Sequence, residues 1–137
     1  MADYEYEAGK DAARVNRSFY QAFRDLDLEA MSTVWLADDS VRCIHPGWDL
    51  ITGFPAVMTS WCAIFSNTES LMIDISDVSV QIVAEMAWVT NVEMVRAVAD
   101  GAATVGRVLA TNLYRFDDGA WRMVLHHASP VHQRLPS

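Results

Sequence analysis

In the stretch SLMIDISDVSVQI (residues 70–82), apolar and polar residues alternate, and the phase of that alternation changes halfway along. Leu71, Ile73 and Ile75 stand at odd positions, whereas Val78, Val80 and Ile82 stand at even positions. A period of two is typical of a β-strand, and a β-bulge, which adds one residue to one strand, changes its phase and sharpens its bend. We therefore expect a bulge near Ser76–Asp77 and a strongly curved sheet.

Three more strands are predicted after this stretch, over residues 85–98, 104–116 and 121–129. The dipeptides Asp100-Gly101 and Asp118-Gly119 separate the last three strands, and Asp-Gly is a strong signal for a tight hairpin turn. Hairpins join antiparallel neighbours, so the second half of the chain predicts a four-stranded antiparallel meander.

The first half of the chain has the three- and four-residue apolar spacing of amphipathic helices. We predict one helix from Asp11 to Leu26, a second capped by Asp27 and a third that begins near Phe54. A short strand from Val41 to His45 precedes the third helix and stops at a Pro-Gly turn. The predicted order is α-α-β-α-β-β-β-β, an α+β fold in which three N-terminal helices pack inside the curved antiparallel sheet.

Length and composition limit the classes of function. The 137 residues suffice for a single domain, spanning 1–137 with its core at about 10–130. A formal net charge of −8 and scattered arginines argue against nucleic-acid or anionic-membrane partners. The N-terminal residues do not resemble a signal peptide, and the apolar runs are too short to span a membrane, so we expect a cytoplasmic protein.

Several local strings occur in an order that resembles the nuclear-transport-factor-2-like superfamily, and its SnoaL-like and ketosteroid-isomerase-like branches most closely. These strings are FYQAF (residues 19–23), DLEAM (27–31), DDSV (38–41), GFPAV (53–57) and WRMVLHHAS (121–129). The resemblance implies a cystatin-like cone with a mostly apolar pocket, which would take a small hydrophobic ligand. It also implies a homodimer formed through the outer face of the sheet. Function does not follow from the fold, since the superfamily includes isomerases, cyclases, dehydratases and binding proteins.

The segment from Cys43 to Trp48 contains the leading catalytic candidate, His45. Ketosteroid-isomerase-like proteins have a carboxylate followed by proline on this short strand, and His45-Pro46 lies at a similar place. A histidine there is suited to proton transfer near neutral pH. Alternatively, His45 only hydrogen-bonds the backbone across the turn.

A ketosteroid isomerase also needs hydrogen-bond donors for an oxyanion, and the resemblance directs attention to four residues, Tyr20, Tyr114, Glu93 and Asn112. Glu93 has apolar neighbours, and it either faces solvent on the outer side of the sheet or lines the pocket with a raised pKa. Of the adjacent His126 and His127, only one can face the pocket, because side chains alternate along a strand. If Trp121, Met123 and Leu125 mark the buried face, the inward residue is His127.

Three tryptophans complete the predicted site. Trp35 and Trp61 lie on apolar helix faces and belong either to the core or to the ligand contacts. Trp48 follows the Pro-Gly turn, where an amphipathic ring would suit the rim of a pocket. No spaced metal-ligand motif, phosphate loop or nucleophile motif occurs, so we expect neither a metal nor a cofactor.

These residues lead to three hypotheses. The first is an acid/base isomerase, cyclase or dehydratase that acts without a cofactor on a hydrophobic carbonyl-bearing compound, with His45 leading and His127 or Tyr20 assisting. The second is a non-catalytic protein that binds a small ligand in the same pocket. The third is a dimerising accessory module with a collapsed pocket.

Overall fold

The structure is a computed structural model that describes residues 2–132. Three helices and six strands occur within these residues and confirm the predicted α+β fold. In chain order they are α1 (Ala2–Arg24), α2 (Leu28–Val34), β1 (Arg42–Ile44), β2 (Ile51–Thr52), α3 (Phe54–Asn67), β3 (Ser70–Val83), β4 (Met86–Ala99), β5 (Ala102–Asp117) and β6 (Ala120–Pro130). The two-residue β2 and the start of α1 at Ala2 were not predicted.

The strands form one sheet in the order β2-β1-β6-β5-β4-β3. The four long strands form the predicted antiparallel meander, and their turns at Asp100-Gly101 and Asp118-Gly119 have the positive φ angles of tight hairpins. The short β1 pairs in parallel with β6, which was not predicted. This pairing places the segment that carries His45 beside the end of β6.

Two bulges interrupt the ladders. The first lies between Ser76 and Ser79 of β3, where Asp77 has a φ of 55°, and it confirms the bulge predicted there. The second lies in β6, where Met123 and Leu125 face consecutive residues of β5 and Val124 is the extra residue. This second bulge reverses the inward–outward alternation of β6 after Met123.

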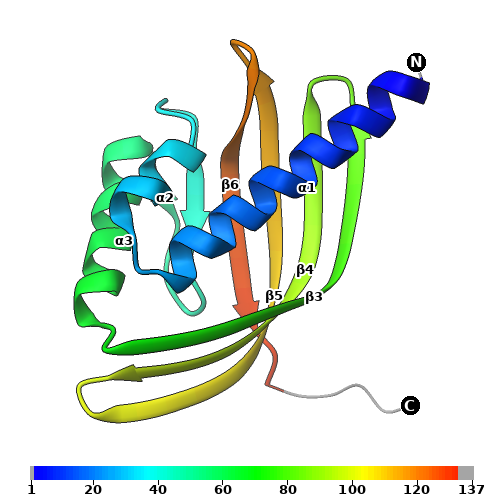
Figure 1. Cartoon of the computed structure of the whole chain (residues 1–137). Helices are drawn as coiled ribbons and strands as arrows, with labels where there is room; N and C mark the ends of the chain where they lie inside the picture. The colour runs from blue at the N-terminus through cyan, green and yellow to red at the C-terminus, as the bar shows by residue number, and fades with distance from the viewer. Residues whose placement is uncertain (1, 133–137) are drawn as a thin grey trace.

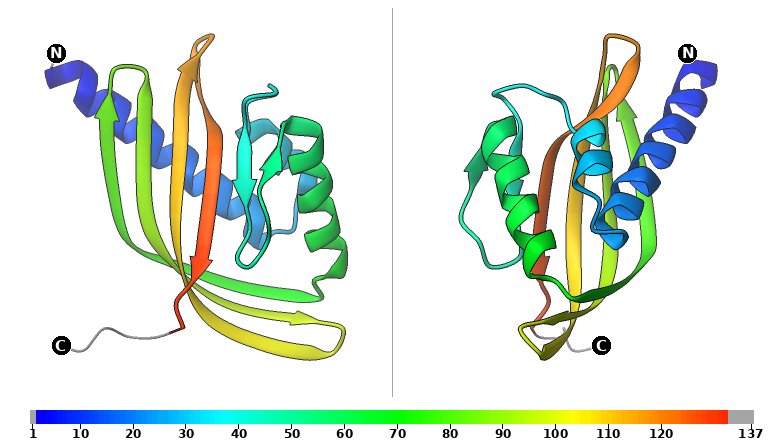
Figure 2. Two further views of the ribbon diagram at one scale, coloured as in Figure 1. Left: turned by 180° about the vertical axis from the view of Figure 1, so that it is seen from behind. Right: turned by 60° about the vertical axis from the view of Figure 1, so that its left-hand side comes forward.

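The sheet bends strongly around the helices, as Figure 1 shows. Helix α1 crosses its concave face, and the ends of β3, β4 and β5 curl beneath α3 (Figures 1 and 2). A continuous core of buried apolar side chains fills most of the space between helices and sheet, including Phe19, Met31, Trp35, Val57, Trp61 and Tyr114. The curled strand ends leave an open region next to α3, and the candidate site lies there.

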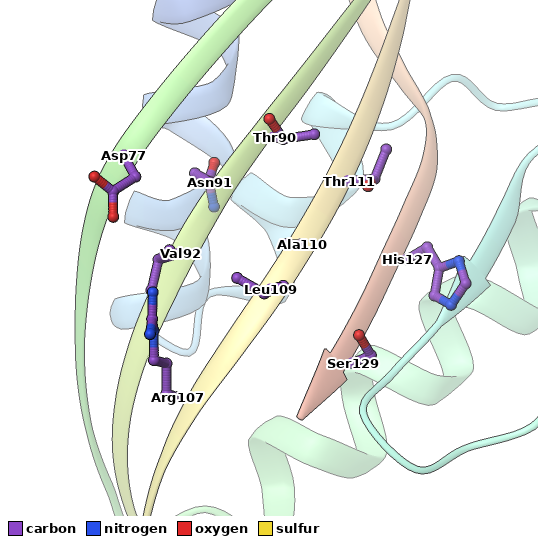
Figure 3. A pocket seen from close by; sticks show the side chains of 10 residues that line it. All are labelled: Asp77, Thr90, Asn91, Val92, Arg107, Leu109, Ala110, Thr111, His127 and Ser129. Atoms are coloured by element: carbon purple, nitrogen blue, oxygen red, sulfur yellow. The ribbon is translucent and has the colours of Figure 1, made fainter. Parts of the chain in front are cut away.

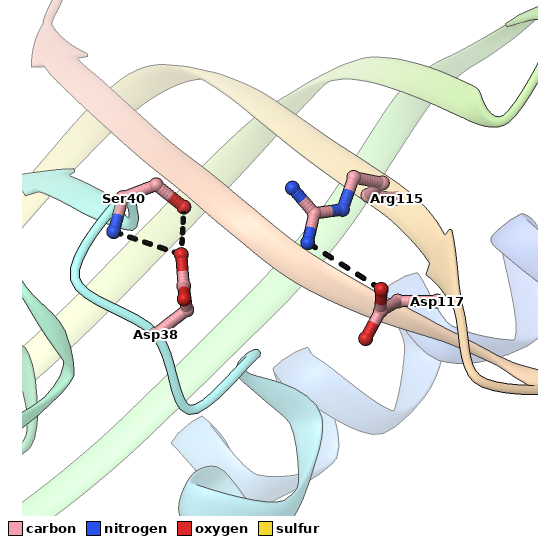
Figure 4. Close-up of polar contacts among 4 residues, drawn as sticks. All are labelled: Asp38, Ser40, Arg115 and Asp117. Carbon is pink, nitrogen blue, oxygen red and sulfur yellow. Dashed lines mark hydrogen bonds and ion pairs between the residues drawn. The ribbon is translucent and has the colours of Figure 1, made fainter.

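Local hydrogen bonds fix the segment between α2 and α3. Asp27 caps α2, as predicted, by accepting a hydrogen bond from Ala30 N at 3.0 Å. Before β1, Asp38 accepts hydrogen bonds from the backbone N–H and the hydroxyl of Ser40, near an ion pair of 3.5 Å between Arg115 and Asp117 (Figure 4). The turn at Asp38 thus sets the direction in which the chain enters β1.

Among the residues that the structure describes, no helix combines the length and the apolar character needed to cross a lipid bilayer.

Candidate active site

A cavity of about 390 Å³ lies between α3, the turn after β1 and the curled ends of the long strands. Apolar side chains from α1, α3 and the curled strands form most of its wall, among them Phe23, Ile64, Leu71 and Val95. Three titratable side chains also line it, His45, Glu93 and His126. A mostly apolar cavity with a few convergent polar groups is the usual form of a small-molecule site.

His45 lies at the wall of this cavity, as predicted. Its side chain is 2% exposed, its Nε2 is 2.9 Å from Ser60 Oγ, and its ring packs against Trp48 and Trp61. Burial lowers the pKa of His45 to about 4, because the charged imidazolium is poorly solvated there. The expectation that His45 titrates near neutral pH is therefore wrong, and the ring is neutral at pH 7.

Glu93 of β4 also lines the cavity, which agrees with the second of the two positions considered for it. Its Oε2 accepts a hydrogen bond of 2.6 Å from the Tyr20 hydroxyl. Burial raises the pKa of Glu93 to about 7, and the Tyr20 hydrogen bond opposes this rise. Glu93, rather than His45, is therefore the cavity group that changes protonation near neutral pH.

Tyr20 belongs to a network of buried polar side chains that ties α1 to three strands. Its hydroxyl oxygen accepts hydrogen bonds from Asn91 Nδ2 at 2.9 Å and Asn112 Nδ2 at 3.1 Å. Asn16, one helical turn before Tyr20, donates to Asn91 Oδ1 and accepts from Asn112 Nδ2 and the Tyr114 hydroxyl. Tyr20 and Asn112 do not themselves line the cavity, and they act on it through Glu93 and His126.

His126, and not His127, faces the cavity. The side chain of His126 is 1% exposed, and its Nδ1 is 2.6 Å from Asn112 Oδ1. Burial, with smaller contributions from His45 and His127, lowers the pKa of His126 to about 3. The prediction of an inward His127 is wrong because the bulge at Val124 reverses the alternation that Trp121 and Met123 begin.

His127 is exposed on the outer face of the sheet. There it borders a shallow hollow of about 610 Å³ that Figure 3 shows across β3 to β6, with Thr90, Thr111 and Arg107. This hollow is larger than the cavity, but of its lining residues only Asn91, Val92 and Ala110 are buried, and its titratable side chains are exposed. We therefore place the candidate site in the smaller cavity, where three buried titratable groups meet.

The three tryptophans have different environments. Trp48 is 46% exposed, lines the cavity and contacts the His45 ring edge-on, as a rim residue would. Trp61 is fully buried behind His45 and His126 and supports both rings without lining the cavity. Trp35 is a core residue away from the cavity, so it is not a ligand contact there.

Sequence reasoning missed Asn16 and Ser60 and chose the wrong member of the histidine pair. Asn16 could have been identified from the sequence, because it is a polar residue on the apolar stripe of α1, one turn from Tyr20. Ser60 could not, since serine is common on helices and nothing in the sequence distinguishes this one. Within residues 2–132, no three His, Cys, Asp or Glu side chains are grouped as metal ligands.

The chain is similar to known proteins over nearly all of its length. A family model described as a SnoaL-like domain matches residues 13–133. The F-box protein SKIP8 of Arabidopsis thaliana is 35% identical over 124 residues, which are 90% of this chain. The chain spans about half (51%) of the length of that curated relative.

Two solved structures are similar in both sequence and fold. One is a provisionally assigned dehydratase of the NTF2-like family from Streptomyces avermitilis, 30% identical, with a TM-score of 0.84 and coverage of 90% of this chain and 96% of that one. The other is a provisionally assigned calcium/calmodulin-dependent protein kinase type II association domain from Thiobacillus denitrificans, 35% identical, with a TM-score of 0.77 and coverage of 86% and 93%. With its cone, its cavity and these similarities, the chain belongs to the SnoaL-like domain family.

Proposed function

We propose that this protein is an acid/base catalyst for small hydrophobic carbonyl compounds, of the isomerase, cyclase or dehydratase type, and that it needs no cofactor. The observation that carries the proposal is Glu93, a carboxyl group at the wall of an apolar cavity with a pKa of about 7. An acid/base group is most effective when its pKa lies near the working pH. The similarity to the provisionally assigned dehydratase also supports this class.

In this proposal Glu93 is the base and Tyr20 is a positioning residue. The Tyr20 hydroxyl holds Oε2, and the other oxygen, Oε1, has no partner among the described residues. Oε1 takes a proton from a carbon next to the substrate carbonyl, and the electron pair moves onto the carbonyl oxygen. The carboxylic acid then returns the proton, either to another carbon, which gives an isomer, or to a leaving hydroxyl group, which gives water and an alkene.

Trp48 and the apolar wall bind the rest of the substrate. The Trp48 ring is partly exposed at the mouth, and its indole N–H is free to donate a hydrogen bond to a carbonyl oxygen. The side chains of Phe23, Ile64 and Val95 offer an apolar surface, which favours a substrate with a hydrocarbon ring or chain. Exclusion of water by this surface also keeps the pKa of Glu93 raised.

The test is proton exchange at carbon, since it needs no knowledge of the natural substrate. 2-Indanone, cyclohexanone and 2-cyclohexenone are incubated with the protein in D₂O, and mass spectrometry follows deuterium uptake. We expect faster uptake than in buffer for at least one ketone, with a rate that rises with pH through about 7 as Glu93 ionises. Uptake at the buffer rate for all three ketones, or a Glu93→Gln variant as fast as the wild type, would contradict the proposal.

A second candidate function is that of a dimerising domain, which the outer face of the sheet favours. Exposed apolar side chains gather there on β4 and β5, including Met94, Val105 and Leu109. The face that carries them is the one through which the family resemblance implies a homodimer. The similarity to an association domain supports this function, which is compatible with a working cavity on the other face.

A further inference from the structure

We infer that the two cavity histidines are both held as hydrogen-bond acceptors, and that the cavity therefore selects an apolar compound carrying at least two hydroxyl groups. The inference deepens the proposed function and rests on it only in placing the ligand in the same cavity. It follows from which atom donates and which accepts in each hydrogen bond around the two histidines.

Glu93 determines which groups donate and which accept in this hydrogen-bond network. Above its pKa of about 7, Glu93 is an ionised carboxylate that only accepts hydrogen bonds, so Tyr20 gives its single hydroxyl proton to Oε2. The oxygen of Tyr20 is then an acceptor, and the atoms of Asn91 and Asn112 that face it must be their NH₂ groups. A flipped Asn112 would turn its oxygen toward two acceptors, the Tyr20 oxygen and Asn16 Oδ1, and lose both bonds.

The orientation of Asn112 decides the tautomer of His126. Because the Asn112 NH₂ group faces Tyr20 and Asn16, its Oδ1 faces His126 Nδ1 at 2.6 Å, and Nδ1 must carry the proton. The ring is neutral at pH 7, since burial lowers its pKa to about 3. Nε2 of His126 therefore carries a free lone pair.

The orientation of Ser60 decides the tautomer of His45 in the same way. Ser60 gives its one hydroxyl proton to Val57 O at 2.6 Å, so its oxygen accepts the Nε2–H of His45 at 2.9 Å. The other nitrogen, Nδ1, then carries the lone pair of a neutral ring. Among residues 2–132, the polar atom near it is the Cys43 sulfur, which is 3.9 Å from Nδ1 and closer, at 3.6 Å, to Nε2. The two histidines have opposite tautomers, and each keeps one acceptor nitrogen.

Two of the free acceptor atoms, His126 Nε2 and Glu93 Oε1, reach the cavity. Among residues 2–132, the side-chain nitrogen and oxygen atoms that are both sealed from solvent and unpartnered are the indole Nε1 atoms of Trp35 and Trp61. His126 Nε2 and Glu93 Oε1 also lack partners, so they must retain accessible surface, and the surface these residues share is the cavity wall. The ring centres of His45 and His126 are 6.3 Å apart, within the span of one small molecule.

Beside the histidines and Glu93, this arrangement favours hydroxyl hydrogens and disfavours groups that only accept. A carbonyl group of the same ligand has a donor elsewhere, the Trp48 indole N–H at the mouth. Two neutral imidazole nitrogens and a carboxylate oxygen all need donors, and burying them without donors carries the penalty of unpaired polar groups. The apolar remainder of the wall selects the hydrocarbon frame that carries the hydroxyl groups. The ligand class is therefore a hydroxylated cyclic or chain compound that presents two donors on one side.

The experiment measures the tautomers and the selectivity separately. Long-range ¹H–¹⁵N correlation spectra at pH 7.5 should show His126 with its proton on Nδ1 and His45 with its proton on Nε2. In titration calorimetry, 4-butylresorcinol should bind at least ~10-fold more tightly than its dimethyl ether, which has the same frame and no donors. His126 with its proton on Nε2, equal affinities, or no binding of the diol would each overturn the inference.

Variants assign the selectivity to the network. In Asn112→Leu, the His126 proton should leave Nδ1, and the preference for the diol should fall about 10-fold. In Ser60→Ala, His45 should no longer be held in a single tautomer. Thr111→Val, on the outer face of the same strand, and Thr59→Val, on the exposed side of α3, are the matched controls and should change neither. If a variant does not fold, the wild-type spectra and the two affinities still decide the inference.

The outcomes also separate this inference from the proposed catalysis. Selective diol binding with both predicted tautomers, but no deuterium uptake by any ketone, including a hydroxylated one such as 4-hydroxycyclohexanone, would support the ligand class and refute the catalytic function. Uptake that depends on Glu93 together with equal binding of diol and diether would support catalysis and refute the ligand class.

Discussion

Both faces of β4 and β5 carry polar residues, but the burial and the hydrogen bonding of these residues differ between the two faces. On the concave face, Asn91, Glu93 and Asn112 are buried, and each has a hydrogen-bond partner. On the outer face, Thr90 is exposed and Thr111 is half-buried, and neither takes part in a side-chain network. Helix α1 makes the difference, because its Asn16 and Tyr20 supply partners to the concave face alone.

A polar strand residue can therefore face the interior where another element supplies its hydrogen-bond partners. Burial of an unpaired amide or carboxyl group costs more than apolar contacts return. The functional consequence is that the concave face can hold groups with shifted pKa values, such as Glu93 and His126, without unfolding the protein.

The largest expected effect is on catalysis. Glu93→Gln keeps the shape of the side chain but removes the base, so the rate of deuterium uptake into a responsive ketone should fall by ~10²–10⁴. Thr90→Val, on the outer face of the same strand, should leave that rate unchanged. A Thr90→Val variant with a similar loss would show that the two faces are not functionally distinct.

The next effect concerns pH and stability. Glu93 has a pKa of about 7 in the folded protein against an ordinary 4.5, so the folded state binds its proton more tightly than the unfolded state does. The folded protein therefore loses stability from this group as the pH rises from about 4.5 to 7, by about 3 kcal/mol in total.

His45 and His126 act in the opposite direction, because their pKa values of about 4 and about 3 lie below the ordinary 6.5. Protonation of the unfolded chain destabilises the fold as the pH falls below 6.5, so these two groups make stability rise with pH up to that point. In urea unfolding between pH 4.5 and 8, Glu93→Gln should gain stability relative to the wild type as the pH rises. Parallel curves for the two proteins would contradict the pKa assigned to Glu93.

Removal of one network member should cost less. Asn112→Leu leaves the Nδ1–H of His126 without an acceptor and deprives Asn16 and Tyr20 of one donor each. The free energy of unfolding should fall by about 1–3 kcal/mol, the cost of a buried unpaired polar group. Thr111→Val should stay within about 0.5 kcal/mol of the wild type, as outer-face substitutions usually do.

The smallest effect concerns the outer face itself. If this face forms a dimer, Leu109→Asp places a charge in the interface and should raise the dissociation constant at least ~10-fold, which is about 1.4 kcal/mol. Leu50→Asp is the matched control, because Leu50 is 53% exposed, close to the 48% of Leu109, but lies outside the sheet. Light scattering over a concentration series gives both values, and a wild-type monomer at micromolar concentration would contradict the dimer.

Much of the fold could be predicted because its signals are local. The phase change at Ser76–Asp77, the cap at Asp27 and the Asp-Gly turns each depend on a few adjacent residues. The bulge at Val124 left no such signal, since Val124 lies between two apolar residues and either phase of β6 would bury an apolar side chain. The wrong choice of His127 follows from that single residue.

The site was harder to predict because its chemistry depends on contacts between distant segments. The Pro-Gly turn predicted that the short strand ends at His45, and the family resemblance implied that His45 faces the pocket. Its lowered pKa could not be predicted, because it depends on burial by Trp61 and its neighbours. The raised pKa of Glu93 likewise depends on the depth of the cavity, which alternation along β4 does not reveal. Such long-range effects need the assembled fold.

The parallel pairing of β1 with β6 has a consequence for how the protein folds. Arg42 and Leu125 are partners, although most of the chain lies between them. Contacts between such distant segments form slowly, because a long loop must close before the pairing returns any stabilisation. During synthesis, β1 leaves the ribosome long before β6 exists, so His45 meets His126 only after the meander is complete. Binding of the proposed ligand should therefore develop later than the helical signal in a refolding experiment.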